Sequence, residues 1–260
     1  MAARRAILLT LGLAALVAGL AGALGISALV DDAVDVPRRP MTASEQAAPD
    51  EGEPGVEEID WAAWREINPD VIGWVSIPGT GIDHPVAQAP SWDEEHYLRH
   101  DAYGKRNPCG CPYLDAGCAE EGLLGCRNAV ILGHNINGGL LFSDLSRFSD
   151  EEYARAHDEV LIQTPDESRT YRVVAVDVIR GTSAVKRTSF DGYADFEGWW
   201  ATRYESSRLR LAEELPEVGQ VAMLVTCSYN FWRENERTVV YAVPEGAGMA
   251  AYNGGEADER

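Results

Sequence analysis

The sequence is poor in basic residues. Lys and Arg together number 22 against 42 Asp and Glu, so the 260-residue chain carries a formal net charge of −20 at pH 7. Proteins that bind nucleic acid need a basic patch to neutralise phosphates, and this deficit argues against a nucleic-acid partner. An acidic surface that keeps an exported protein soluble explains the charge without reference to any substrate.

Cysteine is scarce as well, and four of the five residues lie close together, at Cys109, Cys111, Cys118 and Cys126. Their spacing lacks the paired C-x2-C knuckles of common structural zinc sites, so zinc is the weaker interpretation. In an oxidising compartment the four predict two disulfides of undetermined connectivity and leave Cys227 unpaired. An unpaired thiol on an exported protein requires a functional explanation.

One long hydrophobic run is present, at the N-terminus. Two arginines precede Ala6 to Val30, a segment with only two polar side chains. A helix of about 25 residues at about 1.5 Å each is longer than the ~30 Å hydrocarbon layer. A cleavable signal peptide is the alternative, because residues 21–23 resemble a cleavage site, but its apolar part would be shorter. Basic residues before the run and acidic residues after it predict a single-pass anchor in the cell membrane at residues 1–30, with the rest of the chain extracellular.

Composition divides the remaining chain into three parts. Residues 31–57 are rich in Pro, Gly, Ala and acidic residues without apolar periodicity, which predicts a flexible extracellular linker. Residues 246–260 are similar and predict a disordered tail. Residues 58–245 show no internal repeat and are long enough for one catalytic domain with a sizeable core.

The segment for this domain combines short strand patterns with a few helices. Strands are expected on both sides of the turn at Pro78-Gly79, and at residues 128–132, 159–164, 170–179, 221–226 and 237–243. Helices are expected at residues 59–68, 149–157 and about 195–215. Many short strands with helices as insertions predict a mostly β fold, a small closed barrel with peripheral helices, rather than a doubly wound sheet.

Cys227 lies where a strand pattern ends and a polar loop begins, a position at which a rigid scaffold can meet a substrate. A thiol attacks a carbonyl only as the thiolate, so a catalytic cysteine needs a basic or cationic neighbour. Arg237 opens the next strand, and if the two strands form a hairpin the two residues face each other across its mouth. A guanidinium there can stabilise an oxyanion. The alternatives are a buried core thiol and a surface ion pair of Arg237 with Glu234 or Glu236.

His134 is the histidine best placed to act on such a thiol. It follows the strand pattern at 128–132 and precedes a Gly-rich loop, so its imidazole is expected to project into an open crevice. The other histidines are His84, His96, His100 and His157. On the residues alone, a structural role stays open for each of the five.

Several motifs occur in order between Ile59 and Val243. They include "INPDVIGWVSIPGTGIDHPVAQ", "YLRHDAYGK", "ILGHN" within "ILGHNINGGLLFSDL", and "LVTCSY" with an arginine ten residues after its cysteine. Together they resemble the sortases, the cysteine transpeptidases of bacterial surfaces, and in particular the class B sortases.

The resemblance implies Cys227 as the nucleophile, His134 as the acid and base, and Arg237 as the group that stabilises the substrate carbonyl. It suggests three further substrate-binding candidates, Thr226, Tyr229 and Asn135. It also implies an eight-stranded barrel, two N-terminal helices and a long helix ahead of the strand that leads to Cys227. No metal or cofactor is expected.

The implied function is that of a membrane-anchored extracellular transpeptidase of a Gram-positive surface. It would cleave a Pro-x-Thr-like sorting signal after its threonine. The acyl group would then pass, through a cysteine thioester, to an amine of the peptidoglycan stem or of a pilin lysine. A secreted cysteine peptidase that only hydrolyses and a non-enzymatic surface binding domain are the alternatives. The cysteine-rich segment and the "NFWREN" loop depart from the family pattern and bear on substrate selectivity.

Overall fold

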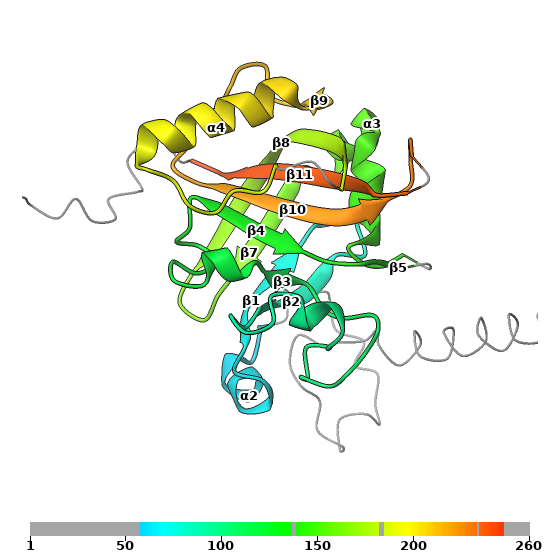
Figure 1. Cartoon of the computed structure of the whole chain (residues 1–260), viewed down its shortest axis with the longest axis vertical. Helices are drawn as coiled ribbons and strands as arrows, with labels where there is room; N and C mark the ends of the chain where they lie inside the picture. The colour runs from blue at the N-terminus through cyan, green and yellow to red at the C-terminus, as the bar shows by residue number, and fades with distance from the viewer. Residues whose placement is uncertain (1–57, 137–138, 182–184, 233, 247–260) are drawn as a thin grey trace, which may run out of the picture. The chain divides into compact units, whose positions relative to one another are not determined.

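The computed structural model describes residues 58–136, 139–181, 185–232 and 234–246 (Figure 1). Within those ranges no helix has the length and apolarity needed to cross a bilayer. The anchor and linker expected before residue 58 lie outside them, as does nearly all of the expected tail, so these domain assignments stay predictions.

Eight strands form a closed barrel of mixed direction. Their order around the barrel is β11-β10-β4-β3-β2-β1-β7-β8, and β8 pairs with β11 to close it. The strands are β1 (Val71–Ser76), β2 (Asp83–Gln88), β3 (Tyr113–Leu114), β4 (Asn128–Leu132), β7 (Glu159–Gln163), β8 (Ser168–Arg180), β10 (Val221–Ser228) and β11 (Glu236–Pro244). The expected eight-stranded barrel is therefore confirmed.

Three further short strands lie outside the barrel. β9 (Leu209–Arg210) extends the sheet beyond β8, and β5 (Asn135–Ile136) pairs with β6 (Leu140–Leu141) in a two-stranded ribbon.

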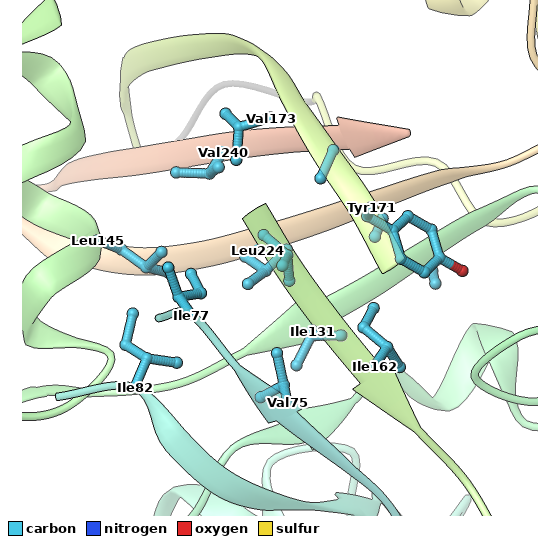
Figure 2. Close-up of a cluster of buried hydrophobic side chains, with 14 of the residues drawn as sticks. Val75, Ile77, Ile82, Ile131, Leu145, Ile162, Tyr171, Val173, Leu224 and Val240 are labelled. Atoms are coloured by element: carbon cyan, nitrogen blue, oxygen red, sulfur yellow. The ribbon is translucent and has the colours of Figure 1, made fainter. Parts of the chain in front are cut away.

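The barrel is filled by aliphatic side chains from opposite walls. Val75, Ile131, Leu224 and Val240 are fully buried in one cluster, and Figure 2 shows them in the barrel interior. Their neighbours in sequence point outward, because successive side chains of a strand alternate between faces. Tyr241 on the outer face packs against α4 (Tyr193–Ser206), with its ring 5.9 Å from that of Trp200. β10 and β11 are thus buried on both faces, which explains their nearly continuous apolar sequence.

The helices begin where the sequence supplies caps. Asp60 accepts a hydrogen bond from the Ala63 amide at the start of α2 (Trp61–Ile67), and Asp150 accepts one from the Tyr153 amide at the start of α3 (Glu151–Ala156). Short 3-10 helices occur at η2 (His96–Leu98), η3 (Ala116–Cys118) and η4 (Ser143–Ser149). Of the two N-terminal helices that the resemblance implies, the described residues contain α2.

The long helix ahead of β10 is present but shorter than expected. It was expected over residues 195–215, whereas α4 ends at Ser206 and Ser207 is extended. Leu209 then pairs with Val176 of β8, and the Leu211 amide donates to the Val174 carbonyl at 2.8 Å. Burial of Leu209 and Leu211 against the barrel core and hydrogen bonding to β8 outweigh the helical spacing of this segment.

Candidate functional site

Cys227 and Arg237 lie directly opposite each other on adjacent strands. In the antiparallel pair of β10 and β11, Cys227 is the register partner of Arg237. Directly opposed residues of an antiparallel pair point to the same face of the sheet. Both side chains are half-buried at the mouth of the hairpin, and the expected hairpin geometry is confirmed.

His134 follows β4, which pairs with the edge of β10 opposite to β11. β4 runs parallel to β10 with Leu132 opposite Val225, and the Gly133 amide donates to the Val225 carbonyl at 3.1 Å. One residue after His134, the Asn135 side-chain amide donates to the Cys227 carbonyl at 2.8 Å. The three predicted catalytic residues therefore gather at the ends of three adjacent strands. Their catalytic roles stay predictions.

All three belong to the outer face of the barrel. Leu132, Val225 and Val239 pack in the cluster under α4, outside the barrel interior. Cys227 lies two residues after Val225, and Arg237 two residues before Val239, so the period of two places both on that outer face. The site is consequently open to the surface instead of enclosed in the barrel.

The backbone orients the His134 ring. Its Nε2 lies 3.0 Å from the carbonyl oxygen of Leu98, at the end of η2. A carbonyl oxygen only accepts hydrogen bonds, so Nε2 carries the proton in this contact, and Nδ1 of the neutral ring is left as the acceptor. The sequence motif around Leu98 gave no sign of this role, because the contact is made by a main-chain atom.

The substrate-binding candidates have different surroundings. Thr226 is 1% exposed, and its hydroxyl donates to the Gly133 carbonyl at 3.0 Å, so it ties β10 to the residue before His134. Asn135 holds the Cys227 carbonyl. Tyr229 is 65% exposed on the loop that follows β10. Contact with substrate stays a prediction for each, and Tyr229 offers the largest accessible surface of the three.

Glu236 is buried, contrary to one of the alternatives considered for Arg237. A surface ion pair with Arg237 was one alternative, yet Glu236 is 1% exposed, and Arg237 Nη1 donates to its backbone oxygen at 3.0 Å. The carboxylate turns inward to the loop between the two strands. The surface-pair interpretation fails for Glu236 because strand alternation sends its side chain to the opposite face from that of Arg237.

The motifs also gave no indication of Tyr113 on β3, whose hydroxyl is influenced by Cys227. Burial raises the pKa of its hydroxyl, and the ionisable groups of Asp115, Glu95, Asp93 and Cys227 raise it further. Tyr113 therefore stays protonated, and it is 3% exposed.

The remaining histidines make other contacts. Burial lowers the pKa of His84, which favours its neutral form. The rings of His96 and His100 stack with centroids 3.8 Å apart, and that of His157 stacks on Tyr153 at 4.1 Å. These contacts leave His134 as the histidine beside Cys227.

All five cysteines are free thiols in the structure, which therefore does not show the expected disulfides. Cys227 is half-buried, whereas the other four are buried. Cys118 and Cys126 share the main core cluster, and their thiols are within hydrogen-bonding reach of each other. The described part of the chain contains no group of three or more His, Cys, Asp or Glu residues placed to hold a metal ion.

Comparison with known proteins gives the family. A family model for the sortase domain matches residues 75–245. Sortase B of Listeria monocytogenes is 26% identical over 176 residues, which cover 68% of this chain and 70% of that protein. The X-ray structure of Clostridium perfringens sortase B superposes with a TM-score of 0.62 at 25% identity, covering 70% of this chain and 97% of that one.

A crystal structure of sortase B in complex with triglycine has a TM-score of 0.61 and 19% identity, covering 70% of this chain and 84% of that one. At that identity the likeness concerns the fold. The family match, by contrast, extends over well more than half of this chain and ends just past β11. The chain belongs to the sortase family of cysteine transpeptidases, with class B sortases as its relatives.

Proposed function

We propose that this sortase is anchored in the cell membrane by residues 1–30 and that its extracellular domain attaches proteins carrying a C-terminal sorting signal to a surface amine. The observation that carries the proposal is the register of Cys227 with Arg237, one strand away from His134. Tethering suits this task, because donor protein and acceptor amine are both found at the outer face of the membrane.

Acylation is the first step. The Cys227 thiolate attacks the carbonyl carbon of the signal's threonine, and the guanidinium of Arg237 donates hydrogen bonds to the oxygen that becomes negative. The C–N bond after the threonine then breaks. His134 Nδ1, which has taken the proton of the Cys227 thiol, gives that proton to the departing amine, and the acyl group is left as a thioester on Cys227.

Transfer is the second step. His134, now neutral, accepts a proton from the incoming amine, whose nitrogen attacks the thioester carbon and expels the thiolate. Water competes for the same carbon, so transfer exceeds hydrolysis only when the amine is better positioned than water. The Leu98 carbonyl supports this positioning by holding the imidazole in one orientation.

The test is mass spectrometry of peptide products. A relative has been solved in complex with triglycine, so triglycine is the first amine to try, followed by lysine and a peptidoglycan stem peptide. With an Asn-Pro-x-Thr peptide we expect the N-terminal fragment joined to triglycine, and the free acid without an amine. Hydrolysis alone with every amine would indicate a cysteine peptidase. No cleavage of any peptide in a Pro-x-Thr library would favour a binding domain.

We also propose that Cys118 and Cys126 form a disulfide in the exported protein. Their backbones are linked through Gly122, whose amide donates to the Cys118 carbonyl at 2.8 Å and whose carbonyl accepts from the Cys126 amide at 3.2 Å. The Cys126 thiol lowers the pKa of Cys118, so this sulfur is the better nucleophile of the pair. Two thiols would lose two protons and two electrons to a disulfide oxidant such as oxidised glutathione.

After treatment with oxidised glutathione, a digest with trypsin, Asp-N and Glu-C should release the Cys118 and Cys126 fragments as one disulfide-linked species. Acidic residues at 115, 120 and 121 allow these cuts between the cysteines. Closing this short loop should stabilise the fold by about 2–3 kcal/mol, so reduction should lower Tm by about 5–10 °C. The link should survive Cys109→Ser. Linkage of Cys118 to Cys109 or Cys111 would refute the pairing.

A further inference from the structure

The loop between the two active-site strands is folded around a buried carboxylate. Glu236 Oε1 accepts a hydrogen bond from the Asn230 amide at 2.6 Å. Its Oε2 accepts from the amides of Phe231 and Trp232, each at 2.7 Å. Three consecutive main-chain donors therefore converge on one side chain that is 1% exposed.

This carboxylate lies one residue from the active-site residue on each strand. Glu236 is the register partner of Ser228, while the next pair along is Cys227 with Arg237. On its other side Glu236 is opposite Arg180 of β8. Any movement of the loop that releases Glu236 will therefore shift the ends of both β10 and β11.

Glu236 is held in its ionised form. Burial opposes ionisation, but the polar groups around the carboxylate, the Ser228 hydroxyl and the hydrogen-bonding amides of residues 230–232, outweigh it and lower the pKa of Glu236. Arg180 is the charged residue of β8 in register with Glu236, and Asp177 lies three residues before it; η4 carries Asp144 and Arg147, and Arg237 and Glu234 are near along the chain.

The rest of the loop is attached to its surroundings as well. The Asn230 side-chain amide donates to the Ser146 carbonyl at 2.6 Å and to the Ser149 hydroxyl at 3.0 Å, which joins the loop to η4. The Arg208 guanidinium lies 3.9 Å from the ring centroid of Phe231. Tyr229 and Phe231 are nevertheless 65% and 47% exposed, so the chain exposes two aromatic side chains just after the strand that carries Cys227.

We propose that Glu236 is a positioning residue of this sortase, which holds residues 229–232 in the shape that keeps Arg237 opposite Cys227 and presents Tyr229 and Phe231 to the sorting peptide. The inference rests on the proposed function for its effect on catalysis. The structural part of the inference, that a buried carboxylate organises the loop, depends only on the three hydrogen bonds to Glu236.

Glu236→Gln tests the proposal, because an amide group has one accepting oxygen in place of two and removes the charge. We expect kcat/KM for the sorting peptide to fall about tenfold, mostly through KM, because the misplaced loop weakens peptide binding. Glu236→Asp keeps the charge and should recover part of the loss. Glu234→Gln, an exposed position in the same loop, is the matched control and should stay within twofold.

Two further measurements distinguish an effect of Glu236→Gln on the loop from a general loss of stability and from failure of the proposed function. Hydrogen exchange at the amides of residues 230–232 should be slow in the wild type and faster in Glu236→Gln, whether or not any peptide is transferred. Alkylation of Cys227 by iodoacetamide should change less than twofold. Wild-type kcat/KM together with unchanged amide exchange would overturn the proposal, as would a loss of activity matched by loss of the folded state.

The pH dependence follows from the lowered pKa. A carboxyl group with a folded pKa below its unfolded value of about 4.3 stabilises the fold fully above that value, and this contribution is lost as the pH falls through the folded pKa. The Tm difference between wild type and Glu236→Gln should thus be largest near neutral pH and shrink below about pH 4. A difference that does not shrink as the pH falls well below about 4 would contradict an ionised Glu236.

Discussion

Cys227→Ala should remove peptide cleavage and transfer altogether, a loss of at least about a thousandfold in kcat/KM, because no other group can form the thioester. The comparison of wild type and variant by mass spectrometry checks this directly. A wild-type sample quenched during turnover should contain the protein plus the acyl fragment, released by hydroxylamine. The variant should show neither the adduct nor the product.

The buried cysteines supply the control for this variant. Burial raises the pKa of the Cys109 thiol, so Cys109→Ser should leave the activity unchanged. In the wild type, iodoacetamide should modify Cys227 first, since it is the half-buried thiol while the other four are buried. Its alkylation should slow when His134 is replaced by glutamine. Turnover by Cys227→Ala at the wild-type rate would refute the assignment of the nucleophile.

Arg237→Gln should lower kcat by about a hundredfold to a thousandfold with a smaller effect on KM, because its guanidinium is proposed to bind the oxygen that gains charge only in the transition state. The Arg237 guanidinium lies beside the backbone of Gly181. A Cβ added at Gly181 would be 3.4 Å from Arg237 Cζ. Arg237→Lys keeps the charge but loses the planar fork and should recover only part of kcat.

A surface arginine gives the matched control for this prediction. Arg155 pairs with Glu151 on α3 at 2.8 Å, and Arg155→Gln should leave kcat within twofold. Steady-state kinetics with the sorting peptide at several amine concentrations measures both constants. An Arg237→Gln variant that changes KM alone would show that the guanidinium binds the peptide in its ground state, against the proposed role.

The barrel was predictable because its strands carry a local signal. Residues 128–132 were expected as a strand and form β4 with the same bounds, and the expected strand at 221–226 extends only two residues further as β10. The last turns of the helix expected at 195–215 were not predictable in this way. Leu209 and Leu211 lie two residues apart, which is the spacing of a strand, but the segment is too short for this signal to outweigh the helix before it, and only pairing with β8 shows that both residues belong against the barrel.

The predicted catalytic residues were identified through motifs, whereas their arrangement required the fold. Cys227, His134 and Arg237 were recognised by type and order. The Leu98 carbonyl at His134 Nε2 could not be recognised, since a main-chain oxygen has no sequence signature. The burial of Glu236 could not be recognised either, because the inward direction of its side chain depends on the register of β11.

The amino-acid sequence by itself determined the family, the short strands and helices of the domain, and the identity of the thiol, imidazole and guanidinium, because these depend on local pattern and residue type. Tertiary structure alone decided which strands are neighbours, which face each side chain occupies, and which buried groups orient the reactive ones. Pairing of Asn128 with Val221 joins β4 to β10 across 93 residues of chain, and a register shift of one residue would send Cys227 to the opposite face.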